Sequence, residues 1–387
     1  MNIHRAIVEE GRALWVLFDE NEEIVELPTR FAMSMIKKNR YSSRSVEEYL
    51  KVIKLLCEEI RSKSFYASSS LDEVLSTVGL SFFEDWFGKM RQQKYSPYTT
   101  RTRDVICKSF MQWLTTEAAG RVRSLDDLPY SDGKYITATP YRTVPKYLTY
   151  IEAATFIRHA FKNESERCIA HFMFDTGARV SEVPRVCKVD LPNLANYHPD
   201  QLYLPILIKG SKGRGGAIKQ REAIISRPMV ERLSRLHNNW RIYLKAESRF
   251  KAIDMPMFLN ILGQPITDYA IRNKLYIASK SLLRKGLIQK KVTSHNFRHG
   301  TAFSILQSEH GRDFYENLVV CKGALGHSNI AVTEQSYAQI PAPVIAKIQQ
   351  FNAENGLQER YKEAQYIYEN TFKPQRDHHE NRGHKRK

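Results

Sequence analysis

Several features that would place this chain in a common class of protein are missing from its sequence. No window of its 387 residues approaches the uninterrupted apolar run of about eighteen that indicates a membrane-spanning helix. The first residues, MNIHRAIVEEGRALW, lack the basic start and apolar stretch of a secretory signal. We therefore expect a cytoplasmic protein with no membrane partner.

Cysteine pairs and nucleotide-binding patterns are also missing. The cysteines are five in number, lie far apart and include no CxxC pair, so neither a disulfide framework nor a cysteine zinc site is indicated. The Walker pattern GxxxxGK[ST] is absent, which leaves nucleotide hydrolysis without support. We expect no cofactor and no metal.

Acidic residues are the minority charge. The chain has 42 of them against 59 lysines and arginines, a formal net charge of +17. A fixed positive excess attracts polyanions by counterion release, so nucleic acid is the first partner to consider, with a merely basic soluble protein as the alternative. Residues 1–27 run against this trend with seven acidic and two basic side chains, and we assign no role to this acidic N-terminal segment.

The length of the chain suits two domains rather than one core. Apolar residues at Val46, Leu50, Ile53 and Cys57 have the spacing of one helix face, and Pro97 suits the first position of another helix. These patterns predict a small all-helical domain over residues 28–125. Basic residues on the other faces of its last helix and just before it are candidate DNA contacts, namely Lys94, Arg101, Arg103 and Lys108.

A linker and a second domain follow. Residues 126–146 contain prolines and a glycine without a helical period, which predicts a linker. The pair Thr149 and Glu152 forms a capping box, so a second domain is expected over 147–355, followed by a C-terminal helix and charged tail, 356–387. This domain should alternate helices with one hairpin. The last fifteen residues are predicted to be disordered.

The stretch HNFRHGTAF, residues 295–303, carries the densest group of reactive side chains. With Ser294 as a cap, helical spacing places His295, Arg298 and His299 on one face. Two histidines four residues apart could hold zinc, but the glutamate of HExxH is missing and the arginine would oppose a divalent ion. Arginine binds phosphate in a bidentate manner and imidazole transfers protons near neutral pH, so a phosphodiester suits the group better.

Two other segments are ambiguous when taken singly. In FDTGARVSEVPRV, Gly177 permits a tight turn that places Arg179 at the start of another helix, with Glu182 on the same face. An isolated RxxE is usually a surface ion pair. The glycine-rich hairpin tip with Lys212 and Arg214 is either a mobile cationic element that touches phosphates or a solvated turn.

The segment GALGHSNIAVTEQSY presents His327 after a helix end and Tyr337 ten residues later. Singly, His327 would be a capping or packing residue and Tyr337 one of twenty tyrosines. A tyrosine hydroxyl close to positive charge becomes a better nucleophile, because its charged form is favoured.

Taken in order, TGARxSE, a lysine-bearing hairpin, HNFRH, LGH and the later tyrosine resemble the catalytic domain of tyrosine recombinases, the phage integrase family. The resemblance covers residues 147–350 by motif and residues 28–125 by pattern only. It implies a mainly α fold with a small antiparallel β-hairpin in the catalytic domain. A helical core-binding domain would precede that domain, and the two would form a clamp on DNA.

The resemblance also implies roles for the charged residues. Arg179 and Arg298 resemble the two arginines that hold the non-bridging oxygens of the scissile phosphate, and Glu182 the acidic residue that braces the first of them. His327 resembles the histidine that hydrogen-bonds the phosphate.

The remaining roles concern proton transfer and attack. Tyr337 resembles the nucleophile and His295 the proton-transfer histidine, while His299 supports the site. In the hairpin, KGSKGR selects Lys209 as the residue that protonates the leaving 5′-oxygen, with Lys212 as the fallback. Two departures from the family pattern are the enlarged tip, GRGGAIKQ, and an interval from His327 to Tyr337 that is one residue longer than the commonest spacing.

The implied activity is site-specific cleavage and rejoining of DNA strands through a 3′-phosphotyrosyl intermediate, without metal or ATP. The implied setting is integration or excision of a mobile genetic element in the bacterial nucleoid. Expected partners are double-stranded DNA with recombination sites, three further copies in a homotetramer, and accessory DNA-bending or directionality proteins. The segment after Pro343 either contacts another protomer or packs on its own domain. The alternatives to recombination are relaxation of DNA by a type IB topoisomerase and a non-catalytic DNA-binding protein on the same fold.

Overall fold

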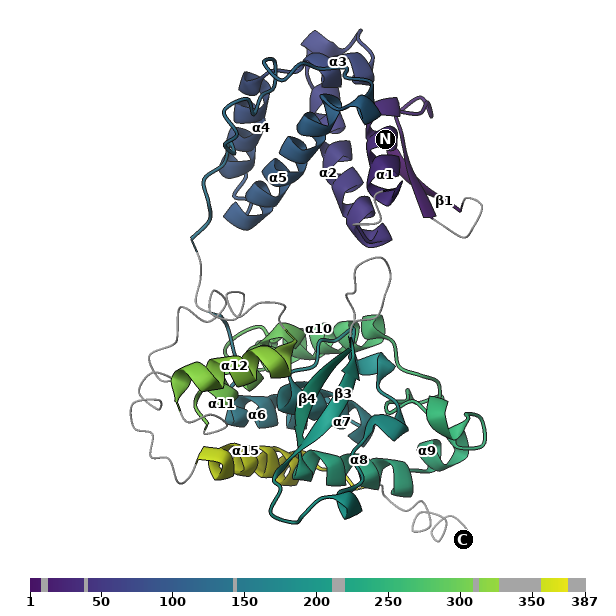
Figure 1. Cartoon of the computed structure of the whole chain (residues 1–387), viewed down its shortest axis with the longest axis vertical. Helices are drawn as coiled ribbons and strands as arrows, with labels where there is room; N and C mark the ends of the chain where they lie inside the picture. Colours follow the sequence, from purple (N-terminus) through teal and green to yellow (C-terminus); the bar gives the residue numbers. More distant parts are fainter. Residues whose placement is uncertain are drawn as a thin grey trace, which may run out of the picture. The chain divides into compact units, whose positions relative to one another are not determined.

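The computed structural model of the chain describes residues 1–7, 13–37, 41–141, 145–210, 220–308, 313–326 and 356–374. They form two compact units, the first within residues 1–142 and the second in the chain that follows (Figure 1). Helices dominate both units, and each has a two-stranded antiparallel sheet, so the predicted mainly α fold with a small hairpin is confirmed. No helix in the described ranges is long and apolar enough to cross a membrane.

The first unit packs its helices on an N-terminal hairpin. Residues 1–27, which the sequence left without a role, supply this hairpin, and Leu17 on its second strand is buried in the same core as the helices. The predicted stripe Val46, Leu50, Ile53 and Cys57 is buried as expected. The elements are β1 (Asn2–Ile7), β2 (Ala13–Phe18), α1 (Glu26–Lys37), α2 (Ser43–Arg61), α3 (Leu71–Thr77), α4 (Leu80–Gln92) and α5 (Pro97–Leu114).

The stretch expected to link the domains is held on the first unit for most of its length. Leu128 and Tyr130 are buried in the core of this unit. Further along, the backbone N–H of Thr137 donates to the carboxylate of Asp104 on α5, at 2.8 Å. The hydroxyl of Tyr98 donates to the carbonyl of Tyr141, also at 2.8 Å. We call residues 128–141 the strap, because they follow α5 rather than leaving the unit.

The second unit is built around α7, most of which is buried. The predicted capping box opens α6, because the backbone N–H groups of Thr149 and Glu152 each donate to the other's side chain, at 2.8 and 3.2 Å. The predicted hairpin pairs β3 with β4 from Tyr203 opposite Ser226 to Lys209 opposite Gln220. The elements are α6 (Tyr150–Ala160), α7 (Glu164–Thr176), β3 (Tyr203–Lys209), β4 (Gln220–Ser226), α8 (Arg227–Asn239), α9 (Arg241–Ala246), α10 (Asp268–Arg284), α11 (Ser294–Leu306), α12 (Phe314–Leu325) and α15 (Gly356–Thr371).

The C-terminal helix α15 packs on its own unit, beside α6 and α8. Near its start, Arg360 donates to the carbonyl of Asp175 at the end of α7, at 2.8 Å. At its end, the fully buried Arg232 of α8 donates to the hydroxyl of Thr371, at 2.7 Å. Of the two alternatives for the chain after Pro343, packing on its own unit therefore holds for α15. The tail beyond residue 374, which we predicted to be disordered, lies outside the described residues.

Candidate active site

The turn that ends α7 brings the first site residues into place. Gly177 follows the helix with φ of +64°, and a Cβ there would lie 2.6 Å from the side chain of Leu325, so glycine is required twice over. No α-helix begins at Arg179, contrary to our expectation. The chain makes a turn and one short 3-10 helix, Val183–Arg185, because Pro184 has no N–H with which to continue an α-helix.

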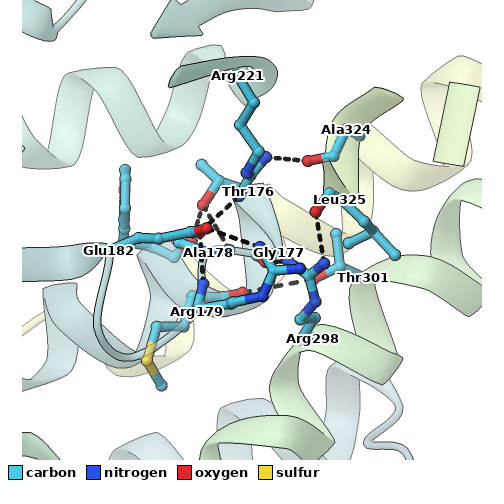
Figure 2. Close-up of polar contacts among 12 residues, drawn as sticks. Thr176, Gly177, Ala178, Arg179, Glu182, Arg221, Arg298, Thr301, Ala324 and Leu325 are labelled. Carbon is cyan, nitrogen blue, oxygen red and sulfur yellow. Dashed lines mark hydrogen bonds and ion pairs between the residues drawn. The ribbon is translucent and has the colours of Figure 1, made fainter. Parts of the chain in front are cut away.

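Glu182 organises this turn from a fully buried position. Its carboxylate accepts hydrogen bonds from the guanidinium and the backbone N–H of Arg179, both at 2.8 Å, and from the guanidinium of Arg221 at 3.0 Å (Figure 2). Burial raises the pKa of this carboxyl, but Arg221 and Arg179 outweigh it and the net pKa is lowered. Glu182 is therefore a carboxylate shared by two arginines.

Arg221 is a site residue that the sequence did not single out, because it was counted among the basic residues of the hairpin tip. It lies on β4, is only 8% exposed, and donates to the carbonyl of Ala324 at the end of α12 (Figure 2). Strand alternation could have found it. Ile225 and Ala223 face the core, and counting back by two along the strand puts Arg221 on the same face.

Arg298 joins the ends of two other helices. Its side chain, on α11, donates to the carbonyl of Gly177 at 2.6 Å and to the carbonyl of Leu325 at 2.5 Å, and the residue is only 5% exposed (Figure 2). The ends of α7 and α12 are thereby fixed next to Arg298. The residue that was expected to bind phosphate also holds the site together.

The two histidines of the HNFRH segment lie on α11 with ring centroids 6.4 Å apart. Helix α11 begins one residue earlier than predicted, with Thr293 rather than Ser294 as its N-cap. Desolvation, Arg298 and Arg179 lower the pKa of His295, and desolvation with His295 and Arg298 lowers that of His299 to about 4. Both rings are therefore neutral at pH 7 and able to accept a proton.

Lys209 is the last residue of β3, and its ammonium contacts Asp190 and Cys187 rather than Glu182 or the two arginines bound to it. Its Nζ lies 3.2 Å from Oδ2 of Asp190 and 4.0 Å from Sγ of Cys187. Within the described residues, no group of three His, Cys, Asp or Glu side chains could hold a metal ion.

The candidate DNA contacts on α5 are mostly engaged within the first unit. Lys108 is 9% exposed, with its ammonium 4.3 Å from the ring centre of Tyr135 on the strap and in contact with the carbonyl of Gly133. Arg101 stacks over the same ring at 3.8 Å. Because the strap covers this side of α5, we withdraw Lys108 from the expected DNA contacts. Arg103 stacks on a tyrosine within the unit, and Lys94 remains exposed.

Comparison with known families decides what this arrangement belongs to. A model of the phage integrase family matches residues 146–342, about half of the chain. The chain belongs to the phage integrase family. Among curated relatives of this family member, the tyrosine recombinase XerC of Thermodesulfovibrio yellowstonii is 25% identical over 264 residues, which cover 64% of the present chain and 79% of XerC. XerC of Halalkalibacterium halodurans is 25% identical over 268 residues, which cover 67% of the present chain and 77% of that XerC.

Solved structures share the fold of this tyrosine recombinase. The Tn1549 transposon integrase in complex with a circular intermediate DNA aligns with a TM-score of 0.56 and 14% identity, covering 84% of this chain and 98% of that one. A lambda integrase dimer bound to a COC' core site aligns with a TM-score of 0.54 and 12% identity, covering 80% and 93%. At these identities the likeness concerns the fold alone.

The described part of this tyrosine recombinase brings together Arg179, Glu182 and Arg298, and it adds Arg221 to them. The histidines of α11 lie close to this group, because the charge of Arg298 lowers the pKa of both His295 and His299. The remaining predicted site residues lie outside the described residues, namely His327, Tyr337, Lys212 and Arg214.

Proposed function

We propose that this protein is a site-specific DNA recombinase that cleaves and rejoins DNA strands through a covalent tyrosine intermediate. The observation that carries the proposal is the group formed by Arg179 and Arg298 around one glycine turn, with a neutral His295 on the same helix as Arg298. Guanidinium groups suit the charge and geometry of a phosphodiester, and a neutral imidazole suits a proton acceptor. Membership of a family of recombinases supports the same reaction.

In the proposed reaction, the hydroxyl of Tyr337 attacks the scissile phosphorus and gives up its proton to His295. The bond from phosphorus to the 5′-oxygen breaks, and Lys209 protonates that oxygen. The products are a 3′-phosphotyrosyl enzyme and a free 5′-hydroxyl. Because one phosphodiester replaces another, the reaction conserves the phosphate bond and requires no ATP.

The arginines and His327 are proposed to stabilise the charge on the pentacoordinate phosphorus. Arg179 is suited to contact the phosphate because 35% of its side chain remains exposed even though Glu182 holds it. Fixed donors of this kind need no reorganisation when the charge develops, and they do the work that metal ions do in many nucleases. Glu182 and His299 act as supporting residues in this scheme.

Double-stranded DNA with specific recombination sites is the proposed substrate. Solved relatives of the same fold were determined as complexes with DNA, including the lambda integrase dimer, and the net charge of +17 supplies attraction that does not depend on sequence. By family analogy we propose four protomers on two sites, integration or excision of a mobile element, accessory DNA-bending or directionality proteins, and a bacterial cytoplasmic location.

The decisive test is covalent capture of DNA. Tyr337→Phe lacks the attacking hydroxyl, so it should form no denaturation-resistant DNA complex while binding duplex DNA as the native protein does. Sequencing the DNA that remains attached to the native protein after cells are denatured would locate the cleavage site. Undiminished capture by Tyr337→Phe would sink the assignment.

A second assay separates recombination from simple relaxation. A recombinase should exchange strands between two copies of the captured site and leave plasmids that lack the site supercoiled. Relaxation of any supercoiled plasmid without strand exchange would assign the protein to topoisomerase-like chemistry instead.

A further inference from the structure

The backbone is held in place at Lys209 and at the residue that follows it. Lys209 pairs with Gln220 across the β3–β4 hairpin. The next carbonyl, that of Gly210, accepts a hydrogen bond from the guanidinium of Arg185 at 2.7 Å. The backbone is thus anchored at the residue itself and just beyond it. Movement of the ammonium must therefore come from the four-carbon side chain.

The ammonium of Lys209 is held by a carboxylate that is itself immobile. Asp190 ends a short 3-10 helix, Lys188–Asp190, and its side chain is 9% exposed. Its Oδ2 accepts the backbone N–H of Cys187 at 2.8 Å and lies 3.2 Å from Nζ of Lys209. The same oxygen thus caps the helix and pairs with the lysine.

The third group in this niche is uncharged. Sγ of Cys187 lies 4.0 Å from the ammonium, and burial raises the pKa of its thiol. A neutral thiol offers only a weak hydrogen bond, so the carboxylate of Asp190 supplies the negative charge that the ammonium faces.

We propose that Asp190 is a positioning residue that holds the ammonium of Lys209 before cleavage and must release it for proton transfer. The proposal rests on the role of Lys209 in the proposed function. Asp190 holds Nζ at its own oxygen, so the lysine side chain must swing away before it can bring one of its three N–H bonds to the leaving 5′-oxygen. The scissile phosphodiester is itself an anion, so bound DNA competes with Asp190 for the ammonium.

The ion pair is suited to release. The side chain of Lys209 is 32% exposed, and ion pairs of partly exposed lysines are weak because water and salt screen them. The need to separate this pair should therefore slow cleavage by the native protein slightly rather than block it. Removing the charge of Asp190 should make cleavage faster. If Asp190 instead oriented the lysine toward the leaving oxygen, removing its charge would make cleavage slower.

The test compares two leaving groups in single-turnover cleavage by the full chain. One duplex carries the normal 5′-oxygen at the scissile phosphate, and the other carries a bridging sulfur. A thiol has a far lower pKa than an alcohol, so a bridging sulfur leaves as the thiolate without a proton donor. Only effects that act through the proton donor should disappear with sulfur.

Asp190→Asn is the main variant, because an asparagine oxygen can still cap the helix. We expect it to cleave the oxygen duplex about two- to fivefold faster, where fivefold corresponds to about 1 kcal/mol. It should cleave the sulfur duplex at the native rate. Glu247→Gln is the matched control, since it removes one carboxylate from an exposed pair with the neighbouring Lys188, and it should leave both rates unchanged.

Other outcomes overturn the proposal. Slower or unchanged cleavage of the oxygen duplex by Asp190→Asn would show that the ion pair does not restrain the lysine. Equal acceleration with both duplexes would place the effect elsewhere than the proton donor. If Asp190→Asn melts below the native protein, Asp190→Ser, whose hydroxyl can also cap, replaces it in the same assay.

Lys209→Ala separates this proposal from the proposed function. It should lose cleavage of the oxygen duplex and recover with the sulfur duplex. Failure of the sulfur duplex to rescue Lys209→Ala would remove the lysine from its proton-donor role. If the sulfur duplex restores cleavage by Lys209→Ala but Asp190→Asn cleaves the oxygen duplex at the native rate, the restraint by Asp190 is refuted. The proton-donor role of Lys209 then still stands.

Discussion

Asp104 in the first unit and Glu182 in the second are both fully buried carboxylates, yet they bind different kinds of donor. Asp104 accepts hydrogen bonds from the hydroxyl of Tyr130 at 3.0 Å and from the backbone and hydroxyl of Thr137 at 2.8 and 2.7 Å. These donors are neutral, and all belong to the strap. The guanidinium of Arg101 is farther away, at 3.8 Å.

Glu182 instead binds two guanidinium groups, those of Arg179 and Arg221. A carboxylate with neutral donors fastens one stretch of chain to another. A carboxylate between two arginines also fixes where positive charge lies, because each guanidinium is held in a defined direction. A buried carboxylate thus stabilises the fold in the first unit. In the second unit, a buried carboxylate stabilises the fold and also positions the charges of the proposed site.

The largest effect should follow from Glu182→Gln. This change leaves the buried Arg221 without its counter-charge, and breaking a buried ion pair by removing one partner costs about 3–5 kcal/mol. Urea unfolding followed by circular dichroism should show this loss in the transition of the second unit. Glu117→Gln, which removes an exposed partner of Arg121, is the control and should leave the curve unchanged. Equal curves for both variants would mean that the burial of Glu182 has no energetic weight.

Arg179→Ala should affect rate more than stability. The side chain is partly exposed, and the backbone N–H that binds Glu182 remains. Losing one fixed donor to a developing negative charge typically costs about 10²- to 10³-fold in rate. Single-turnover formation of the covalent DNA complex measures this, with the exposed Arg158→Ala as a control for the loss of one positive charge. A loss of less than tenfold would take Arg179 out of the proposed phosphate contact.

Asp104→Asn should have the smallest effect and should be confined to the first unit. An amide NH2 group replaces one accepting oxygen, which leaves strap donors unsatisfied at a cost of about 1–3 kcal/mol. Trypsin should then cut faster at Lys134 on the strap. Asp126→Asn, an exposed change just before the strap, should not alter the cutting rate. Faster unfolding of the second unit in Asp104→Asn would contradict the division of roles between the two carboxylates.

Much of the fold follows from local pattern, and the failures have identifiable causes. Apolar spacing and start signals predicted α2 and α5, a capping box predicted α6, and two apolar arms around a glycine-rich tip predicted the β3–β4 hairpin. The N-terminal hairpin was missed because charge was weighed there and the strand ALWVLF was not. Proline and glycine marked the strap as irregular chain. Prolines and glycines do not indicate whether an irregular segment packs on the rest of the protein. The burial of Tyr130 depends on α5, which lies earlier in the sequence.

The site shows the same limit. The resemblance to tyrosine recombinases predicted that Arg179, Glu182 and Arg298 act together, whereas the Arg179 segment taken singly indicated no more than a surface ion pair. The burial of Arg221 and the pairing of Lys209 with Asp190 required the tertiary structure, since each joins positions on separate elements. Alternation along β4 predicts the direction of Arg221, but no local pattern predicts its partner.

The anchoring of α15 has a consequence for how the protein is made. Arg360 bonds to the carbonyl of Asp175, and these residues are 185 positions apart in the chain. Contacts of such long range form late, and during synthesis the N-terminal parts of a chain fold first. The first unit can therefore fold while the ribosome is still at work, but the end of α7, three residues before Arg179, gains its last support only when α15 has emerged. A nascent chain would thus complete the first unit before it could complete the site proposed to cut DNA.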